Sequence, residues 1–95
     1  MIIVISSLAK DSLTSAIIFY HKQNKDIGKK FSDSIKKEIN SLKDNYGIHL
    51  IVNNYYRALL NKLPFAIYYK VTGNKIIIYD ILDTRSNPLQ KFNNL

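Results

Sequence analysis

Two runs of β-forming residues near the end of the chain, FAIYYKV (65–71) and IIIYDIL (76–82), are separated only by TGNK. Branched and aromatic residues favour strands, and a short polar connection containing glycine is typical of a β-hairpin. Pro64 comes just before the first run, where a missing N–H costs a strand little. The pattern predicts an antiparallel hairpin, so the rest of the chain must supply neighbouring strands and a covering layer.

The first half of the chain predicts one short strand and two helices. The run IIVI (2–5) is typical of a buried strand, and the serines after it can cap a helix that begins near Leu8. Apolar residues recur at helical spacing up to Tyr20, and HKQNKD (21–26) predicts a turn in which Asp26 caps a second helix. The second helix carries a regular apolar stripe made of Ile27, Phe31, Ile35, Ile39 and Leu42.

Strands follow this helical hairpin. Gly47 is the expected left-handed residue after the second helix, and YYRALL (55–60) indicates a strand before the β-hairpin. The predicted order is β-α-α-β-β-β, an α+β fold with the N-terminal strand and the helical hairpin packed on one face of a small antiparallel sheet. A chain of 95 residues supports one core rather than two, so residues 1–95 are expected to form a single domain.

Side chains alternate between the two faces of a strand, and this divides the middle strand into two sets. The apolar and aromatic set is expected to face the helices and consists of Phe65, Ile67, Tyr69 and Val71. The other set is expected to be open to solvent and consists of Ala66, Tyr68 and Lys70.

Both arginines of the chain fall near this second set. Arg57 and Asn61 are predicted to lie beside Tyr68 and Lys70, and Arg85 follows the last strand. Arginine is suited to bidentate contact with phosphate or carboxylate groups, and tyrosine can stack on bases or partner side chains. These residues predict a cationic binding face for RNA or an acidic protein; the alternative is an ordinary solvated face of a two-layer fold.

The overall charge also favours an anionic partner. The chain has 14 basic and 7 acidic residues, a formal net charge of +7. Zero cysteines exclude disulfides and thiolate metal sites. The start of the chain lacks the basic region of a signal peptide, and AIIFY (16–20) is far shorter than the roughly 20 apolar residues that span a bilayer. The expected location is the cytoplasm, without a membrane partner.

Residue patterns for common enzyme chemistry are missing from the sequence. His21 and His49 lack the spacing of metal ligands, and both are expected to be exposed. No Ser/His/Asp arrangement, glycine-rich phosphate loop or paired-carboxylate motif is present. The sequence therefore predicts no metal, no cofactor and no small-molecule substrate.

Three segments resemble the ParE/RelE toxins of bacterial type II toxin–antitoxin systems. LAKDSLTSAIIFYHKQNKDIGKKFSDSIKKEINSLKDN (8–45) is similar to the helical hairpin of that family, and NYYRALLNKLPFAIYYKV (54–71) to its paired strands. IYDILDTRSNP (78–88) is similar to its last strand and to the arginine–proline exit that follows. The resemblance covers about residues 3–88 and implies the RelE/ParE-like fold, together with a cognate antitoxin as partner.

The family has two branches with different activities. RelE-like members cleave messenger RNA on the ribosome with several basic side chains, and the resemblance would assign that role to Arg57, Lys62, Lys70 and Arg85. Where that branch has an arginine in its middle strand this chain has Ala66, and Phe92 stands near the position of a late catalytic tyrosine. The strand LPFAIYY (63–69) is more similar to the ParE or plasmid-stabilisation group, whose ParE members inhibit DNA gyrase by binding.

Three hypotheses follow from the resemblance. The first is a ParE-like toxin that inhibits gyrase by binding and is neutralised by an antitoxin, and in this case it is not an enzyme. The alternative is a RelE-like ribonuclease that works with the ribosome and messenger RNA, and the third is an inactive toxin-like binding module. The predicted face that contacts the target or partner consists of Arg57, Asn61, Lys62, Tyr68, Lys70 and Arg85.

Overall fold

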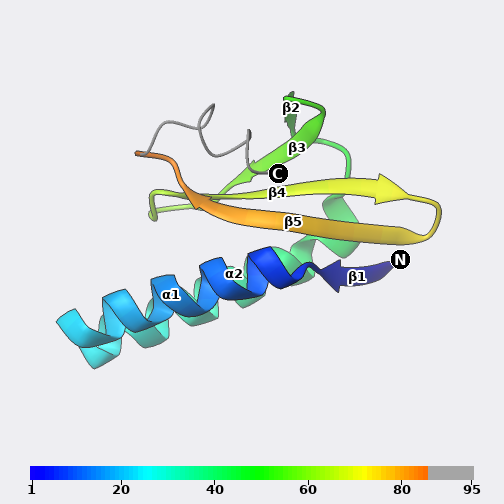
Figure 1. The fold of residues 1–95 in the computed structure, drawn as a ribbon. Coiled ribbons are helices and arrows are strands. Elements are labelled where there is room, and N and C mark those ends of the chain that lie inside the picture. The colour runs from blue at the N-terminus through cyan, green and yellow to red at the C-terminus, as the bar shows by residue number, and fades with distance from the viewer. Residues whose placement is uncertain (86–95) are drawn as a thin grey trace.

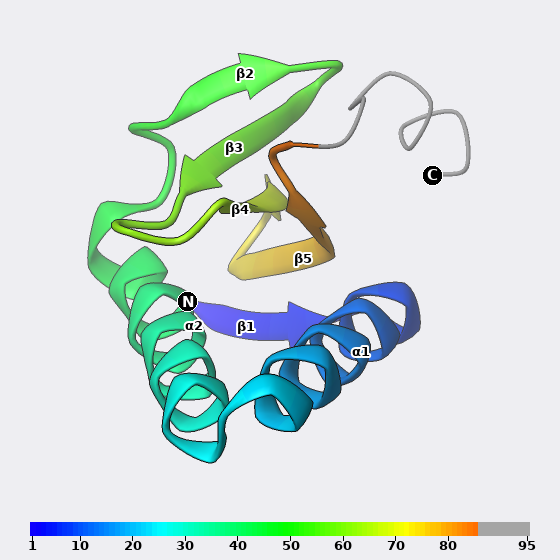
Figure 2. The same ribbon diagram turned by 90° about the vertical axis from the view of Figure 1, so that its left-hand side faces the viewer.

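The computed structural model describes residues 1–85, which form a layer of two helices against one sheet (Figure 1). Its elements are β1 (Ile2–Ile5), α1 (Ser7–Gln23), α2 (Lys25–Asn45), β2 (Leu50–Val52), β3 (Tyr55–Leu59), β4 (Phe65–Thr72) and β5 (Lys75–Asp83). The strand order is β1-β5-β4-β3-β2, and Figure 2 shows both helices on one side of it. The α+β class is confirmed. Pro88, Phe92 and the end of the predicted 1–95 domain lie outside the described residues.

The sheet is mixed, which corrects the prediction of a purely antiparallel sheet. β1 runs parallel to β5, with Ile3 opposite Ile76 and Ile5 opposite Ile78, whereas the other neighbouring strands are antiparallel. Parallel strands need a long crossover connection, and here the whole chain from α1 to β4 supplies it. The first strand is therefore held by the last one.

β2 is an additional strand that the sequence analysis did not predict. It pairs with β3 across a two-residue turn of Asn53 and Asn54, whose φ angles are 52° and 68°. Asparagine tolerates left-handed backbone better than most residues, and two such residues match the twist of a tight hairpin. The observed order is accordingly β-α-α-β-β-β-β.

The helices are separated by one residue rather than by the predicted turn at 21–26. Ser6 caps α1, as the sequence indicates, because its hydroxyl accepts the N–H of Ala9 at 3.0 Å. Asn24, and not Asp26, caps α2, since its side-chain oxygen accepts the N–H of Asp26 at 2.8 Å. Gly47 follows α2 with φ +86°, which confirms the expected left-handed stop.

The two helices touch through their backbones at Gly28. A Cβ atom added there would lie 2.8 Å from the Cα of His21, which is closer than real Cβ atoms come to backbone. Gly28 faces α1 in place of Ile27, so Ile27 is 42% exposed although the stripe predicted it to be buried. The other stripe residues are buried, namely Phe31, Ile35, Ile39 and Leu42.

The main core lies between the helices and the inner face of the sheet. Phe65, Ile67 and Tyr69 of β4 join it, as the alternation predicts. The ring of Phe31 lies 5.0 Å from that of Tyr20 and 4.9 Å from that of Phe65, measured between centroids. These offset rings fix α1, α2 and β4 against one another.

β5 departs from regular alternation at Tyr79, where its register with β4 shifts by one residue. Because of this shift, both Ile78 and Ile81 reach the main core. Asp80 is 5% exposed, and its carboxylate accepts the hydroxyl of Ser12 at 2.6 Å and the N–H of Ile81 at 2.8 Å. The bulge thereby fastens α1 to the sheet.

Candidate functional site

The outer face of the sheet, which points away from the helices, is more covered than the sequence indicated. Ala66 and Tyr68 are 0% and 1% exposed, which corrects the prediction that they are open to solvent. They pack with Leu82, and Val52 and Tyr55 lie against this small cluster. Val52 belongs to β2, so the unpredicted strand contributes directly to the difference.

Arg57 lies on this face and is directed by a tyrosine. It is opposite Tyr68 in the β3–β4 register, and its Nε donates to the Tyr68 hydroxyl at 3.1 Å. The guanidinium is only partly buried, so part of it faces solvent. A charged donor held at one end by a buried ring is suited to contact with an anionic partner.

Lys70 occupies the same face, between two aromatic rings. Its Nζ lies 4.5 Å from the centroid of the Tyr55 ring and 5.7 Å from that of Tyr79. The two rings meet edge to face at 5.1 Å. Both distances from the ammonium group are within cation–π range, so the tyrosines direct the lysine toward the middle of the face.

These contacts define an aromatic–cation face made of Tyr55, Arg57, Tyr68, Lys70 and Tyr79. Sequence reasoning found three of these residues and missed Tyr55 and Tyr79. Tyr55 could have been found from alternation along β3, because it is two residues from Arg57 and therefore on the same face. Tyr79 gave no such signal, because the bulge sets its direction.

Asn61 and Lys62 do not join the aromatic–cation face. β3 ends at Leu59, and the loop that follows carries both residues to α2. There they border a cavity of about 340 Å³. Lys62 has a left-handed backbone with φ 70°, an uncommon conformation for a lysine. The cavity is lined by Ser34, Lys37, Glu38, Leu60, Asn61 and Lys62.

Arg85 also lies outside the aromatic–cation face and pairs with Asp83. Its Nε and Nη2 donate to the carboxylate of Asp83 at 3.0 and 2.7 Å. This bidentate hydrogen bond and the charge of Asp83 raise the pKa of Arg85, with a smaller contribution from Tyr20 of α1. Asp83 is opposite Phe65, a residue of the inner face, so the pair lies on the helix side of the sheet.

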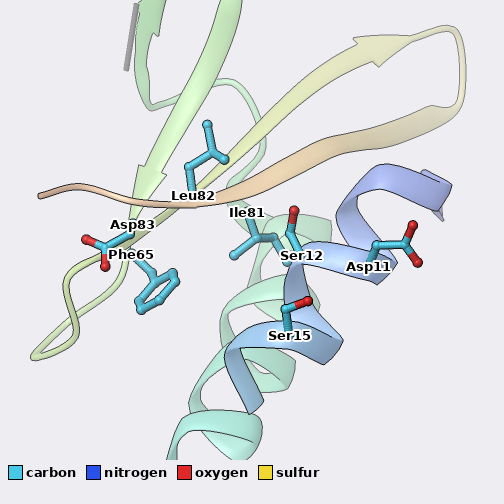
Figure 3. Close-up of a pocket in the computed structure, with 7 residues that line it drawn as sticks. All are labelled: Asp11, Ser12, Ser15, Phe65, Ile81, Leu82 and Asp83. Atoms are coloured by element: carbon cyan, nitrogen blue, oxygen red, sulfur yellow. The ribbon is translucent and has the colours of Figure 1, made fainter. Parts of the chain in front are cut away.

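A cleft on that helix side separates α1 from the end of β5 (Figure 3). Its volume is about 330 Å³. Asp11, Ser12 and Ser15 line its α1 side, and Asp83 lies beside Phe65 at the opposite end. Within residues 1–85 no three His, Cys, Asp or Glu side chains gather closely enough to hold a metal ion. Its lining is Asp11, Ser12, Ser15, Phe65, Ile81, Leu82 and Asp83.

Tyr69, whose ring lies in the core, makes hydrogen bonds through its hydroxyl to the connection between α2 and β2. Its hydroxyl accepts the N–H of Gly47 at 3.0 Å and meets Nδ1 of His49 at 2.5 Å. Burial raises the pKa of Tyr69, the Gly47 hydrogen bond opposes the rise, and neighbouring Tyr56 adds to it. This arrangement joins the end of α2 and the start of β2 to the middle of the sheet. His49, predicted to be exposed, is partly buried by it.

The positions of the basic side chains decide whether the outer face can cleave RNA or only bind a partner. Of the four cations named for RNA cleavage, only Arg57 and Lys70 share a face, while Lys62 lies by α2 and Arg85 on the helix side. Cleavage through a 2′-hydroxyl needs several groups to converge on one phosphate. Two cations among tyrosine rings can instead bind an anionic, partly apolar surface.

Comparison with known proteins identifies the class of fold and one similar solved chain. The fold is a strand and a helical hairpin packed with a mixed sheet. A chain of the structure described as "Chromosomal ParDE TA system from P. aeruginosa" has it too, with a TM-score of 0.78 over 90% of this chain and 97% of that one. The two sequences are 20% identical. No protein-family model and no curated protein matches this chain.

One further finding concerns membranes. Neither α1 nor α2, the helices of residues 1–85, is long and apolar enough to cross a bilayer.

Proposed function

We propose that this protein is the toxin of a type II toxin–antitoxin system, of the ParE-like kind, which inhibits DNA gyrase by binding. The similarity to a chain of a ParDE toxin–antitoxin structure supports the toxin assignment, since it extends over nearly the whole of both chains. The three sequence segments that resemble the family support it independently of the fold.

The dispersal of the cations is the observation that favours binding over RNA cleavage. Arg57 and Lys70 are held by tyrosines, and Arg85 is neutralised by Asp83 on the other side of the sheet. Ala66 stands where the ribonuclease branch has an arginine, and its side chain is fully buried. Within residues 1–85, the four cations named for cleavage therefore do not converge on one phosphate, as stabilisation of a phosphorane would require.

The aromatic–cation face is the surface that we assign to the target. Tyrosine and arginine are enriched at the centres of protein interfaces, because they combine a large contact area with directional hydrogen bonds. Here Arg57 and Lys70 are surrounded by such rings and remain partly exposed. Asn61, Lys62 and Arg85 lie outside this face and are not needed for target contact.

An antitoxin is the second proposed partner, and its expected chemistry follows from charge. A protein of net charge +7 attracts acidic chains, and electrostatic attraction accelerates encounter. Both proposed partners place the protein in the cytoplasm. Expression without the antitoxin is expected to stop growth, and co-expression with it is expected to restore growth.

The decisive experiment is a supercoiling assay with purified gyrase. We expect the wild-type protein to inhibit supercoiling, and Arg57→Ala or Lys70→Gln to weaken inhibition by about tenfold, since each removes one anchored cation. Lys29→Gln, an exposed lysine on α2, is the matched control and should change inhibition little. Gyrase that remains active at saturating protein would contradict the proposal.

Messenger RNA is the parallel readout for the alternative activity. Ribosome-dependent cuts in a translated message that Arg85→Ala abolishes would establish the RelE-like activity instead. The observation that favours this alternative is that Arg57 and Lys70 share one face, where both could contact an RNA phosphate. Unaffected growth, intact message and active gyrase together would indicate an inactive toxin-like module.

A further inference from the structure

The cavity between α2 and the β3–β4 loop is a polar hollow that neither the core nor the aromatic–cation face explains. Ser34, Lys37 and Glu38 line its helix side, where residues three and four apart along α2 share one face. Asn61 and Lys62 line its loop side. Its volume of about 340 Å³ is at the lower end of the range for small-molecule sites, so it suits a small ligand better than a folded partner.

The loop side of this cavity is held in place from both ends. Leu60 is buried and packs in the main core, and its N–H donates to the carbonyl oxygen of Phe65 at 2.9 Å. Between these two residues Lys62 adopts a φ of 70°, which is uncommon for a residue with a Cβ atom. Strained backbone of this kind gathers at ligand sites, where the surrounding structure holds it in place. The cavity is therefore a fixed feature of the fold.

The polar side chains around the cavity are unpaired within residues 1–85. The two lysines and the one glutamate that line it form no ion pair with any residue of that part of the chain. The hydroxyl of Ser34 and the amide of Asn61 likewise make no hydrogen bond to another described residue. Unused donors and acceptors are thus concentrated in one place, with an excess of one positive charge.

The kinds of group present indicate which ligand fits. Lys37 lies on the helix side of the cavity and Lys62 on the loop side, and each ammonium group offers three N–H donors. Two such groups suit the charged oxygen atoms of a phosphate monoester. Glu38 repels a bare anion, yet its carboxylate accepts hydrogen bonds from hydroxyl groups. A phosphate that also carries hydroxyl groups matches both kinds of residue.

We propose that the cavity between α2 and the β3–β4 loop binds a free sugar phosphate as a ligand. Lys37 and Lys62 bind its phosphate group, Ser34 and Asn61 add neutral hydrogen bonds, and Glu38 accepts the hydroxyl groups of the sugar. None of these residues belongs to the aromatic–cation face, so the proposal does not rest on gyrase as the target.

Titrations of the full-length protein with ribose 5-phosphate, inorganic phosphate and ribose test this proposal by nuclear magnetic resonance. We expect ribose 5-phosphate to shift the amide signals of Ser34, Asn61 and Lys62 and to bind about tenfold more tightly than inorganic phosphate. Added salt should weaken this binding, and ribose alone should not bind. A 5′-phosphorylated dinucleotide represents the other source of such a group, the end of a nucleic acid, and should bind more weakly than ribose 5-phosphate.

Three substitutions separate the phosphate contacts from the hydroxyl contact. Lys37→Gln and Lys62→Gln should each weaken the binding of both phosphate ligands by about tenfold, because each removes a charged donor. Glu38→Ala should instead tighten the binding of inorganic phosphate and abolish the preference for ribose 5-phosphate, because it removes both the repulsion and the hydroxyl acceptor. Lys29→Gln, which changes an exposed lysine of α2 outside the cavity lining, is the matched control.

Circular dichroism reports whether each variant folds. If Lys62→Gln does not fold, Lys62→Gly removes the same charge, and glycine adopts the left-handed φ without strain. Lys62→Gly should weaken binding to the same extent, and full affinity in this variant would contradict a role for the ammonium group.

Several results would overturn the proposal. An equal loss from Lys29→Gln would reduce the effect to the net charge of the protein. A preference for ribose 5-phosphate that survives Glu38→Ala would remove the role assigned to the carboxylate, and tighter binding of the dinucleotide would make the end of a nucleic acid the ligand. Absence of binding by ribose 5-phosphate would reject the site, whatever the gyrase assay shows.

Discussion

Tyr68 and Tyr69 are consecutive, equally buried and on opposite faces of the same strand, and they show how the two sides of this sheet differ. The ring of Tyr69 lies in the core, and its hydroxyl meets Gly47 and His49 of the α2–β2 connection. The hydroxyl of Tyr68 accepts a hydrogen bond from Arg57, a cation that reaches solvent. Packing therefore fixes the inner face, while the outer face uses the same residue type to hold a charge in place.

We assign folding stability mainly to the inner face of the sheet and target binding to the outer face. The inner cluster combines residues of both helices with β3, β4 and β5, whereas the outer cluster has Ala66, Tyr68 and Leu82 at its centre. Large-to-small substitutions in a large closed cluster strongly lower stability, because the cavities that they leave do not collapse fully. Substitutions on the outer face should consequently affect target binding more than folding.

The largest expected effect is on the inner face. Phe31→Ala removes a fully buried ring that contacts two others, so the free energy of unfolding should fall by about 3–5 kcal/mol. Leu59→Ala, a 57% exposed residue on β3, should cost less than about 1 kcal/mol. Urea denaturation measures both, and equal losses would erase the distinction between packed and exposed positions.

Removing the hydroxyl from Tyr69 or from Tyr68 should give a smaller difference in the free energy of unfolding between the two faces. Tyr69→Phe removes the hydroxyl that accepts the N–H of Gly47 and meets Nδ1 of His49, so it should cost about 1–2 kcal/mol of unfolding free energy. Tyr68→Phe should cost about 1 kcal/mol or less, because the Arg57 guanidinium can hydrogen-bond water instead. A greater loss from Tyr68→Phe would contradict the assignment of stability to the inner face.

The dependence of stability on alkaline pH provides a separate test of the buried position of Tyr69. The pKa of Tyr69 is raised above its ordinary value of 10.0 in the folded state, so the unfolded chain loses this proton first as pH rises. The contribution of Tyr69 is complete below pH 10.0 and is lost as pH rises through the folded value. Tyr69→Phe should reduce the steepness of the alkaline loss, measured from denaturation midpoints.

A similarly small effect on folding is expected from Lys70→Gln. Loss of the ammonium group between Tyr55 and Tyr79 should lower stability by only about 0.5–1 kcal/mol. Near-ultraviolet circular dichroism should report the changed tyrosine environment. If gyrase inhibition is unaffected while this spectrum changes, Lys70 has a structural role only.

The helical parts of the fold could be predicted because their signals are local. The regular spacing of Phe31, Ile35 and Ile39 is a property of neighbouring turns, and a serine before an apolar stripe caps a helix wherever it occurs. The choice of Asn24 over Asp26 was missed, because both side chains are good caps and only the packing at Gly28 decides how short the turn is.

The outer face could not be predicted from alternation alone. Tyr68 was placed on the correct side, but its burial depends on β2, which is three residues long and joined by an Asn53–Asn54 turn rather than by a stronger Asn-Gly signal. Tyr79 is directed by a bulge, and bulges depend on the partner strand. The site thus depends on non-local pairings that a single sequence does not reveal.

The parallel pairing of β1 with β5 also has a consequence for how the protein is made on the ribosome. β1 is synthesised before β5, yet its hydrogen-bonding neighbour is the last strand, and the hydroxyl of Ser6 donates to the carbonyl oxygen of Tyr79, 73 positions later. Such distant contacts form late and slowly. The complete sheet cannot assemble on a nascent chain that still lacks its last strand, so β1 gains its hydrogen-bonding neighbour only after β5 has been synthesised.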